Sequence, residues 1–343
     1  MKKIITSLFF LVPCITFGQL TAKEYIKQGV ALHDSGKYKE AIESYEKALV
    51  VEKDCQDAIY EIALSNVSLK NYQEAIKHAD ILIKFKKDFV GKGYHLKGMS
   101  LDYLGKPQEA IDVFKKGIKT SPDYTTLYYS LAITSYKLED IITTEKALQD
   151  GLSRNPFHSK SHYLLAILNE YKRSKSLLAL YNYLLLEPEG KTANAAYNLI
   201  LSQHKIGVTE GEDKTINVSI NPNEDDGFST AEMSLSIMEA ASYTEEYKSK
   251  SDFEKFSENT KSFFMILGEL KEKDKLKGFW WDFYVGFFSD LAKDNELYET
   301  FTYYISQDIN STLVETWLRK NSDRVEKLQE WVANYKRSKN QIK

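Results

Sequence analysis

Apolar residues recur every three to four positions along most of the chain, a spacing that predicts amphipathic helices. In the first half these helical segments come in pairs, and short polar turns with glycine at Gly36 and Gly105 separate the two members of a pair. Gly and Pro number only 16 and 6 in 343 residues, which disfavours a turn-rich all-β fold. The pattern therefore predicts an all-α protein built from antiparallel helix pairs.

A small residue recurs at intervals of 34 or 35 residues: Gly29, Ala63, Gly98, Ala132 and Ala166. Two antiparallel helices approach closely only where the facing residue lacks bulk, and the second helices carry a matching small residue at Ala41, Ala75 and Ala110. Pro122 and Pro156, also 34 residues apart, stand where a proline stops the second helix. These positions indicate one helix pair repeated along the chain.

Residues 22–55 are similar to the tetratricopeptide repeat, a 34-residue helix-turn-helix unit. The resemblance is carried by Tyr25, Gly29, Leu32, Gly36, Tyr38, Ala41, Tyr45 and Ala48. The same frame recurs at four later starts: Gln56, Gly91, Thr125 and, more loosely, Ser159. We therefore expect residues 22–190 to form about five repeats, the last one degenerate, stacked as a solenoid that is stabilised by contacts between neighbours.

The resemblance implies that the first helices line a concave groove. Its expected lining is aromatic: Tyr60, His95, Tyr129 and Tyr163 occupy the fifth position of successive repeats, and Tyr103, Tyr136 and Tyr171 follow near the ends of first helices. Tyrosine combines a large apolar area with a hydroxyl, as peptide-binding surfaces favour. These seven residues are the candidate binding site for an unknown protein or peptide, although any single ring can equally pack against the adjacent repeat.

One binding mode of the family is not expected here. Some of its members clamp a carboxylate at the end of a peptide with a Lys and two Asn on successive repeats, and this chain has Ile26, Val30 and Glu61 at those positions. Only Lys92, in the third repeat, matches the basic residues of the clamp. Capture of a C-terminal carboxylate is therefore not predicted.

The 34-residue periodicity ends after Pro188. Residues 191–228 are predicted to be a linker that begins with one more helix and contains a short β-hairpin, because Ile216, Val218 and Ile220 alternate with polar residues. Residues 229–343 are predicted to be a helical C-terminal domain. Capping boxes at Ser229 and Ser251, each followed three residues later by Glu, are expected to open its first two long helices.

Aromatic residues of the second half fall on helical stripes. One is Phe253, Phe256, Phe263, Phe264, Leu267 and Leu270, and the next is Trp280, Phe283, Tyr284, Phe287, Phe288 and Leu291. Such spacing is typical of a buried face. We expect core packing and not a cofactor site.

Residues 1–18 have the pattern of a signal peptide, with Lys2 and Lys3 before an apolar run and Gly18 before the expected cut. The run is shorter than the ~20 residues that span a bilayer, so no transmembrane helix is expected in the mature chain. An exported protein, periplasmic or extracellular, is predicted. Lipid attachment at Cys14, which would make an outer-membrane lipoprotein, is the alternative, but Pro13 breaks that pattern.

The sequence contains none of the common catalytic, nucleotide-binding or zinc-site motifs. We therefore expect no catalytic residues, no cofactor and no metal. Only His158 and His162 share a helical i, i+4 spacing, and packing is the favoured role of His162. The 46 basic and 49 acidic side chains are interspersed, which argues against a nucleic-acid partner.

Together these patterns predict a non-catalytic interaction scaffold of the bacterial cell envelope. Two alternatives stay open from the sequence. One is an envelope hydrolase or carbohydrate-handling protein with a site between the repeats and the C-terminal domain, near Trp280 and Trp281. The other is a lipid-anchored subunit of an outer-membrane assembly.

Overall fold

The computed structural model describes the following residues: 20–85, 88–211, 215–219, 227–244, 247, 249–307 and 312–337. The predicted signal peptide, Cys14 and Ile220 lie outside them. The chain forms two compact units that divide between Leu127 and Tyr128. We call them the N-terminal unit and the C-terminal unit, and describe each by itself.

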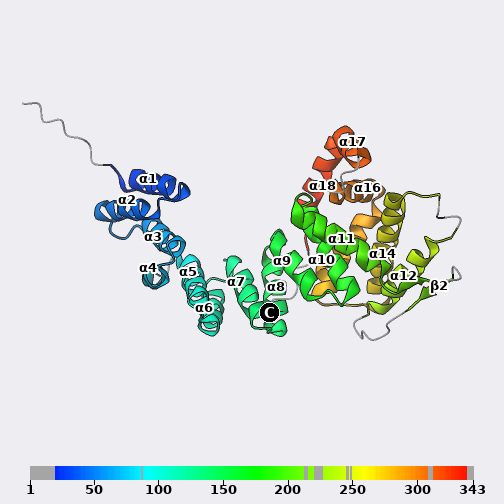
Figure 1. Ribbon diagram of the computed structural model, residues 1–343, viewed down its shortest axis with the longest axis horizontal. Coiled ribbons are helices and arrows are strands. Elements are labelled where there is room, and N and C mark those ends of the chain that lie inside the picture. The colour runs from blue at the N-terminus through cyan, green and yellow to red at the C-terminus, as the bar shows by residue number, and fades with distance from the viewer. Residues whose placement is uncertain are drawn as a thin grey trace, which may run out of the picture. The chain divides into compact units, whose positions relative to one another are not determined.

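The N-terminal unit consists of three successive helix pairs (Figure 1). They are α1 (Ala22–Asp34) with α2 (Tyr38–Val51), α3 (Gln56–Ser68) with α4 (Tyr72–Phe85), and α5 (Val90–Tyr103) with α6 (Pro107–Thr120). The all-α prediction and the repeated pair are both confirmed.

The turn inside each pair uses the same left-handed backbone conformation. Gly36 and Gly105 have φ of 78° and 75°, values that glycine adopts without steric cost. Lys70, which stands at the same place in the second pair, has φ of 62°, and Glu139 in the next pair has φ of 57°. The turn geometry therefore persists where the sequence no longer has glycine.

The small residue of each first helix is matched to the side chain that faces it. A Cβ atom on Gly29 would lie 2.3 Å from Cε1 of the fully buried Tyr45, and one on Gly98 would lie 2.3 Å from Cε1 of Phe114. Where the first helix has Ala63, the corresponding residue of the second helix is Ala79, and both belong to one buried cluster. Glycine thus occurs where the partner is a ring, because there is no space for a methyl group.

The N-terminal unit curves toward its first helices. Helix α1 packs against α3, and α3 against α5, whereas the second helices α2, α4 and α6 contact one another less. We call the side formed by α1, α3 and α5 the first-helix face. The resemblance implied that this side would be concave, and the closer approach of the first helices agrees with it.

The C-terminal unit continues the helical pairs and then changes arrangement. Its pairs are α7 (Thr126–Lys137) with α8 (Ile141–Arg154), and α9 (Ser159–Leu168) with α10 (Arg173–Leu186). The later helices are α11 (Lys191–Lys205), α12 (Ser229–Ala241), α14 (Asp252–Asp274), the π-helix η1 (Trp280–Val285), α15 (Gly286–Lys293), α16 (Asn295–Ile305), α17 (Thr312–Lys320) and α18 (Ser322–Asn334).

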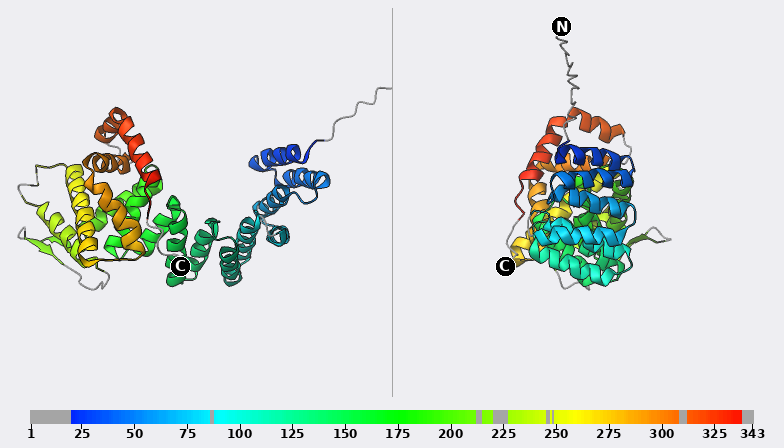
Figure 2. Two further views of the ribbon diagram at one scale, coloured as in Figure 1. Left: turned by 180° about the vertical axis from the view of Figure 1, so that it is seen from behind. Right: turned by 90° about the vertical axis from the view of Figure 1, so that its left-hand side faces the viewer.

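Helix α10 lies in the middle of this unit and has buried residues on all its sides. It packs against α9, α11, α12, the π-helix and α16, and Figure 2 shows later helices, coloured yellow and orange, beside the green helices of this region. The ring of Tyr181 is surrounded by four phenylalanine rings from α14, α15 and α16: Phe256, Phe264, Phe288 and Phe301. The last predicted repeat therefore supplies the core of the C-terminal helices.

Polar groups that α10 buries are satisfied by hydrogen bonds. Arg173 donates to the carbonyl oxygens of Gln203, His204 and Glu232, and to the hydroxyl of Ser236. These bonds join α10 to the end of α11 and to α12. Burying a guanidinium without such partners would cost several kcal/mol, so α10, α11 and α12 are held in one arrangement.

The aromatic stripes are largely buried. The stripe that starts at Trp280 is buried at every predicted position, and in α14 Phe256, Phe263, Phe264 and Leu267 are nearly inaccessible. Phe253 and Leu270, at the two ends of the first stripe, are only partly buried. The sequence did not indicate that Trp280–Val285 would be a π-helix. π-Helical segments are rare in proteins, and those that occur are often found at functional sites.

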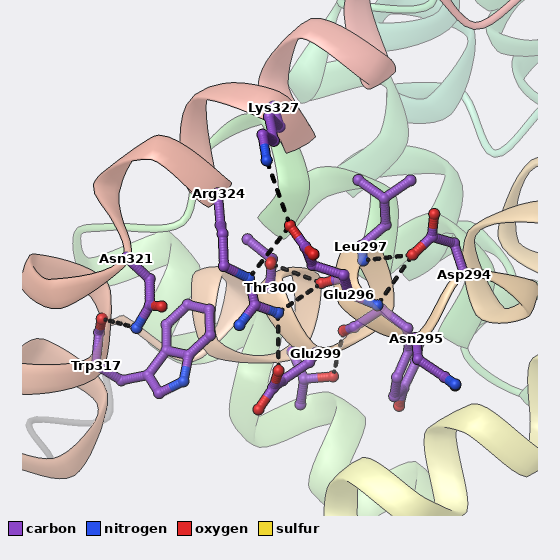
Figure 3. Close-up of polar contacts among 12 residues, drawn as sticks. Asp294, Asn295, Glu296, Leu297, Glu299, Thr300, Trp317, Asn321, Arg324 and Lys327 are labelled. Carbon is purple, nitrogen blue, oxygen red and sulfur yellow. Dashed lines mark hydrogen bonds and ion pairs between the residues drawn. The ribbon is translucent and has the colours of Figure 1, made fainter.

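Helices α16, α17 and α18 are joined by the side chain of Arg324 (Figure 3). Its guanidinium donates to the Glu299 carboxylate over 2.7 Å and to the Glu296 carbonyl oxygen over 3.0 Å. It also lies 4.8 Å from the centroid of the Trp317 ring, which stacks on Tyr303. One arginine thus connects three helices through charge and ring contacts together.

Two local predictions have different outcomes. The hairpin is confirmed: β1 (Val208–Glu210) pairs antiparallel with β2 (Ile216–Val218).

The capping box predicted at Ser251 is present. The one predicted at Ser229 is wrong, because the N-cap of α12 is Phe228 and the Glu232 carboxylate accepts a hydrogen bond from the backbone of Ser174. The backbone N–H of Ser174, at the start of α10, needs a hydrogen-bond acceptor. The Glu232 carboxylate serves as that acceptor and does not cap α12.

Within the described residues, no helix is both long and apolar enough to cross a membrane. The predicted boundaries at 190 and 228 remain a proposal.

We predict that Gly98→Ala lowers the free energy of unfolding by about 1–3 kcal/mol, the usual cost of overpacking. Adding Phe114→Leu to this variant should recover much of the loss, because the next pair has Ala132 and Leu148 at the same two places. Denaturant unfolding of the parent, both single variants and the double variant measures the coupling. Additive losses would contradict the proposed match of the two side chains.

Candidate functional site

The candidate site begins with a row of half-buried rings at the fifth position of the second to fifth repeats; the first repeat has Ile26 there. In the N-terminal unit, Tyr60 of α3 contacts the ring of Phe89, with centroids 5.9 Å apart, and His95 of α5 contacts Tyr124 at 6.2 Å. Phe89 and Tyr124 each stand just before the first helix of the next pair. Each ring of the row is therefore supported by its neighbour in the stack and still has one exposed side.

The C-terminal unit has the same contact in its own repeats. Tyr129 of α7 lies 4.8 Å from the ring of His158, the residue before α9, and Tyr163 of α9 lies 5.1 Å from the ring of Tyr183 in α10. Both tyrosines are half-buried. The supporting residues of the first three contacts come 29 residues after the ring that they support, as Cys55 comes 29 residues after Ile26.

The supporting residues were missed in the sequence, although a signal was present. Cys55, Phe89, Tyr124 and His158 are spaced 34, 35 and 34 residues apart, which is the spacing of the repeat itself. A ring just before a first helix, in register with the fifth position, indicates this contact.

The rings of the N-terminal row are uncharged at neutral pH. Burial raises the pKa of the Tyr60 hydroxyl and lowers the pKa of the His95 imidazole, so both stay in their neutral forms. The ammonium group of Lys92 lies 4.8 Å from the Tyr60 centroid and 4.0 Å from that of Phe89. The faces of these two rings therefore stabilise the positive charge of Lys92 through cation–π contacts.

An apolar strip runs beside these rings on the first-helix face. It consists of the ninth residue of each first helix: Val30, Leu64 and Met99. Leu64 and Met99 pack partly against the core, while Val30 keeps 36% of its surface exposed. Rings, one cation and a partly exposed apolar strip suit an extended peptide, whose apolar side chains need contact area and whose backbone needs polar neighbours.

The other three candidate tyrosines are more exposed and lie at the ends of first helices. Tyr103 is the last residue of α5 and stacks on Tyr72, and Tyr136 lies in the last turn of α7. Tyr171 is 99% exposed and stands in the turn after α9, because that helix already ends at Leu168. Tyr171 therefore does not lie on a first helix as its repeat position implied.

The alternative site near Trp280 and Trp281 is filled by protein. Trp281 stacks on Phe228 with centroids 4.4 Å apart, and Trp280 stacks on Tyr284 at 5.3 Å. Both indoles are more than nine-tenths buried. A sugar-binding tryptophan must expose one ring face, so neither indole can bind a carbohydrate in this way. The hydrolase alternative stays a prediction.

His162 is a buried hydrogen-bonding residue. Its Nε2 lies 2.9 Å both from the carbonyl oxygen of Pro156 and from the amide nitrogen of Asn182, and its Nδ1 lies 2.6 Å from the Tyr284 hydroxyl. His158 bonds separately to the hydroxyl of Ser161. The i, i+4 pair is thus engaged with protein groups, and the described residues contain no cluster of three or more His, Cys, Asp or Glu suited to a metal ion.

Comparison with protein families finds two matches, both to the tetratricopeptide repeat, at residues 22–55 and 91–124. The chain therefore contains tetratricopeptide repeats in these two segments. Repeats of this class are scaffolds for protein interaction, and this is the general function that they define for the chain.

Several solved repeat proteins are similar to about half of the chain. TTC0263, a thermophilic protein of Thermus thermophilus, has 18% identity and a TM-score of 0.42 over 53% of this chain and 98% of its own. PilF of Pseudomonas aeruginosa has 14% identity and a TM-score of 0.42 over 53% and 88%. YrrB, a repeat protein with an unusual peptide-binding site, has 19% identity and a TM-score of 0.38 over 54% and 92%. A search of curated proteins finds no match.

We predict that acid weakens the C-terminal unit through His162. Burial lowers the pKa of His162 from 6.5 to about 3, so the unfolded chain binds a proton below pH 6.5 that the folded chain does not. Stability is therefore lost as the pH falls from 6.5 toward 3, by about 1.4 kcal/mol per pH unit for one group. Unfolding in urea at pH 7, 6 and 5 should show a shallower dependence for His162→Gln than for the parent. Equal slopes would contradict the neutral, buried state of this histidine.

Proposed function

We propose that the chain is an exported, non-catalytic scaffold of the bacterial cell envelope that binds a peptide or protein segment on the first helices of its repeats. The observation that supports this most is the row of half-buried rings at the fifth position, Tyr60 and His95 in one unit and Tyr129 and Tyr163 in the other. Three of these rings contact the residue just before the next first helix, and Tyr163 contacts Tyr183 of its own pair. Export is proposed from the signal-peptide pattern of residues 1–18.

The physical case is that such rings lose little entropy on binding. A tyrosine that is already packed on one side offers contact area without the cost of ordering a mobile side chain. The apolar strip beside them adds contacts that do not depend on charge. The proposed partner is a segment with apolar or aromatic side chains.

We predict that a photoreactive benzoylphenylalanine at Val30 crosslinks to the partner in intact cells. The matched control places the same residue at Val50, in α2 of the same repeat, where the side chain is 80% exposed and lies on a second helix. Adducts identified by mass spectrometry should form from Val30 and not from Val50. Adducts from both positions alike, or from Val50 alone, would overturn the assignment of the first-helix face.

The ring row is tested in the same cells. Alanine at Tyr60 and His95, the two rings in the same unit as Val30, should abolish the Val30 adduct, because the partner loses its main contact area there. Circular dichroism of the purified variant checks that the helices remain, which is needed because the same rings support the stack. A folded variant that still gives the adduct at the parental level would rule out these rings as the binding residues.

A further inference from the structure

A charged cleft lies within the C-terminal unit and includes none of the residues of the ring row. It has a volume of about 470 Å³ and lies between the end of α14, the π-helix with α15, and the residues that follow α18. Five lysines line it: Lys271, Lys275, Lys277, Lys293 and Lys336. Three carboxylates line it as well: Glu272, Asp282 and Asp290.

The three carboxylates are already engaged. Asp282 lies 3.4 Å from the Lys271 ammonium and accepts a hydrogen bond from the Gly278 backbone. Asp290 lies 3.1 Å from the Lys293 ammonium and accepts a bond from the Tyr335 hydroxyl over 2.7 Å. Glu272 lies 3.7 Å from that same Lys293 ammonium.

The other lysines of the cleft have no such counter-charge. Lys275, Lys277 and Lys336 form no ion pair within the described part of the chain. Five ammonium groups against three carboxylates leave an excess of two positive charges. Like charges brought together in one cleft raise the local potential and attract an anion.

Helix ends alone do not account for these lysines. A lysine in the last turn of a helix is favoured by the helix dipole, which explains Lys271 in α14 and Lys293 in α15. Lys277 and Lys336 lie outside any helix, and they reach the cleft from two different segments.

The wall of the cleft includes two glycines. A Cβ atom on Gly286, the first residue of α15 after the π-helix, would lie 3.2 Å from Nζ of Lys271. On the facing helix, a Cβ on Gly268 would lie 2.0 Å from the Ser289 hydroxyl, so α14 and α15 meet closely at the base.

We propose that this cleft binds a phosphate group. A phosphate dianion matches the excess of two positive charges, and the compact ammonium of lysine is a common phosphate ligand. The group can belong to a small soluble molecule or to a lipid headgroup. The cleft shares no residue with the ring row, so this proposal does not rest on the peptide proposed for the repeats.

The test compares the chain with Lys275→Gln, Lys277→Gln and Lys336→Gln against the parent. The control variant removes the same charge from exposed lysines of the N-terminal unit, Lys39→Gln, Lys47→Gln and Lys53→Gln. Calorimetric titration with inorganic phosphate at constant ionic strength measures the first source. Sedimentation with phosphatidylglycerol vesicles, against phosphatidylcholine vesicles, measures the second.

The parent and the control variant should bind at least one of the two probes, and the cleft variant should bind it about tenfold more weakly, as expected when charged hydrogen bonds are lost. Binding of phosphate identifies a soluble ligand, and binding of the anionic vesicles alone identifies a headgroup. The proposal is overturned if the parent binds neither probe, or if the cleft and control variants bind equally well. These outcomes leave the crosslinking result at Val30 unaffected.

Discussion

The structure of the C-terminal unit depends on one constraint, the burial of α10 on all its sides. A helix of a repeat array normally keeps one side toward solvent, since only neighbouring repeats cover it. Helix α10 instead presents buried side chains all round, and the later helices pack against it through Tyr181 and its surrounding phenylalanines. The array therefore ends inside a globular core, which covers its last pair in place of a separate polar cap.

This arrangement places demands on the polar groups that α10 carries inward. Arg173 donates to three carbonyl oxygens and one hydroxyl. Farther along the helix, the amide oxygen of Asn182 accepts from Arg337, whose guanidinium also lies on the rings of Phe283 and Phe287. Burial lowers the pKa of Arg337 to about 10, and it remains charged at neutral pH. Arg337 is thus held by amide, carbonyl and ring contacts, whereas the carboxylates of Glu232 and Glu239 also act on the charge of Arg173.

Periodic features were predictable from the sequence, and features set by single tertiary contacts were not. The 34-residue recurrence predicted the helix pairs, because the close approach at Gly29 and its equivalents restricts residue size in every repeat. The aromatic stripes predicted buried faces because their spacing matches the helical period. By contrast, the capping box predicted at Ser229 does not form, because Glu232 instead accepts a hydrogen bond from the backbone of Ser174, which is distant in sequence. The burial of Trp281 likewise involves Phe228, which is far from it in sequence. For the ring row, spacing indicated the positions, but the support from the following repeat became visible only in three dimensions.

The match between first and second helices limits how such an array can evolve. Gly29 and Gly98 face rings, whereas Ala63 shares its cluster with the small Ala79. Moving a complete pair to another place in the array carries both members of a match along. Exchanging a single helix would instead set a methyl group against a ring, or glycine against alanine with a void between them. Recombination breakpoints that preserve folding should therefore fall between pairs. The unit that recombination can exchange in this chain is the helix pair and not the single helix.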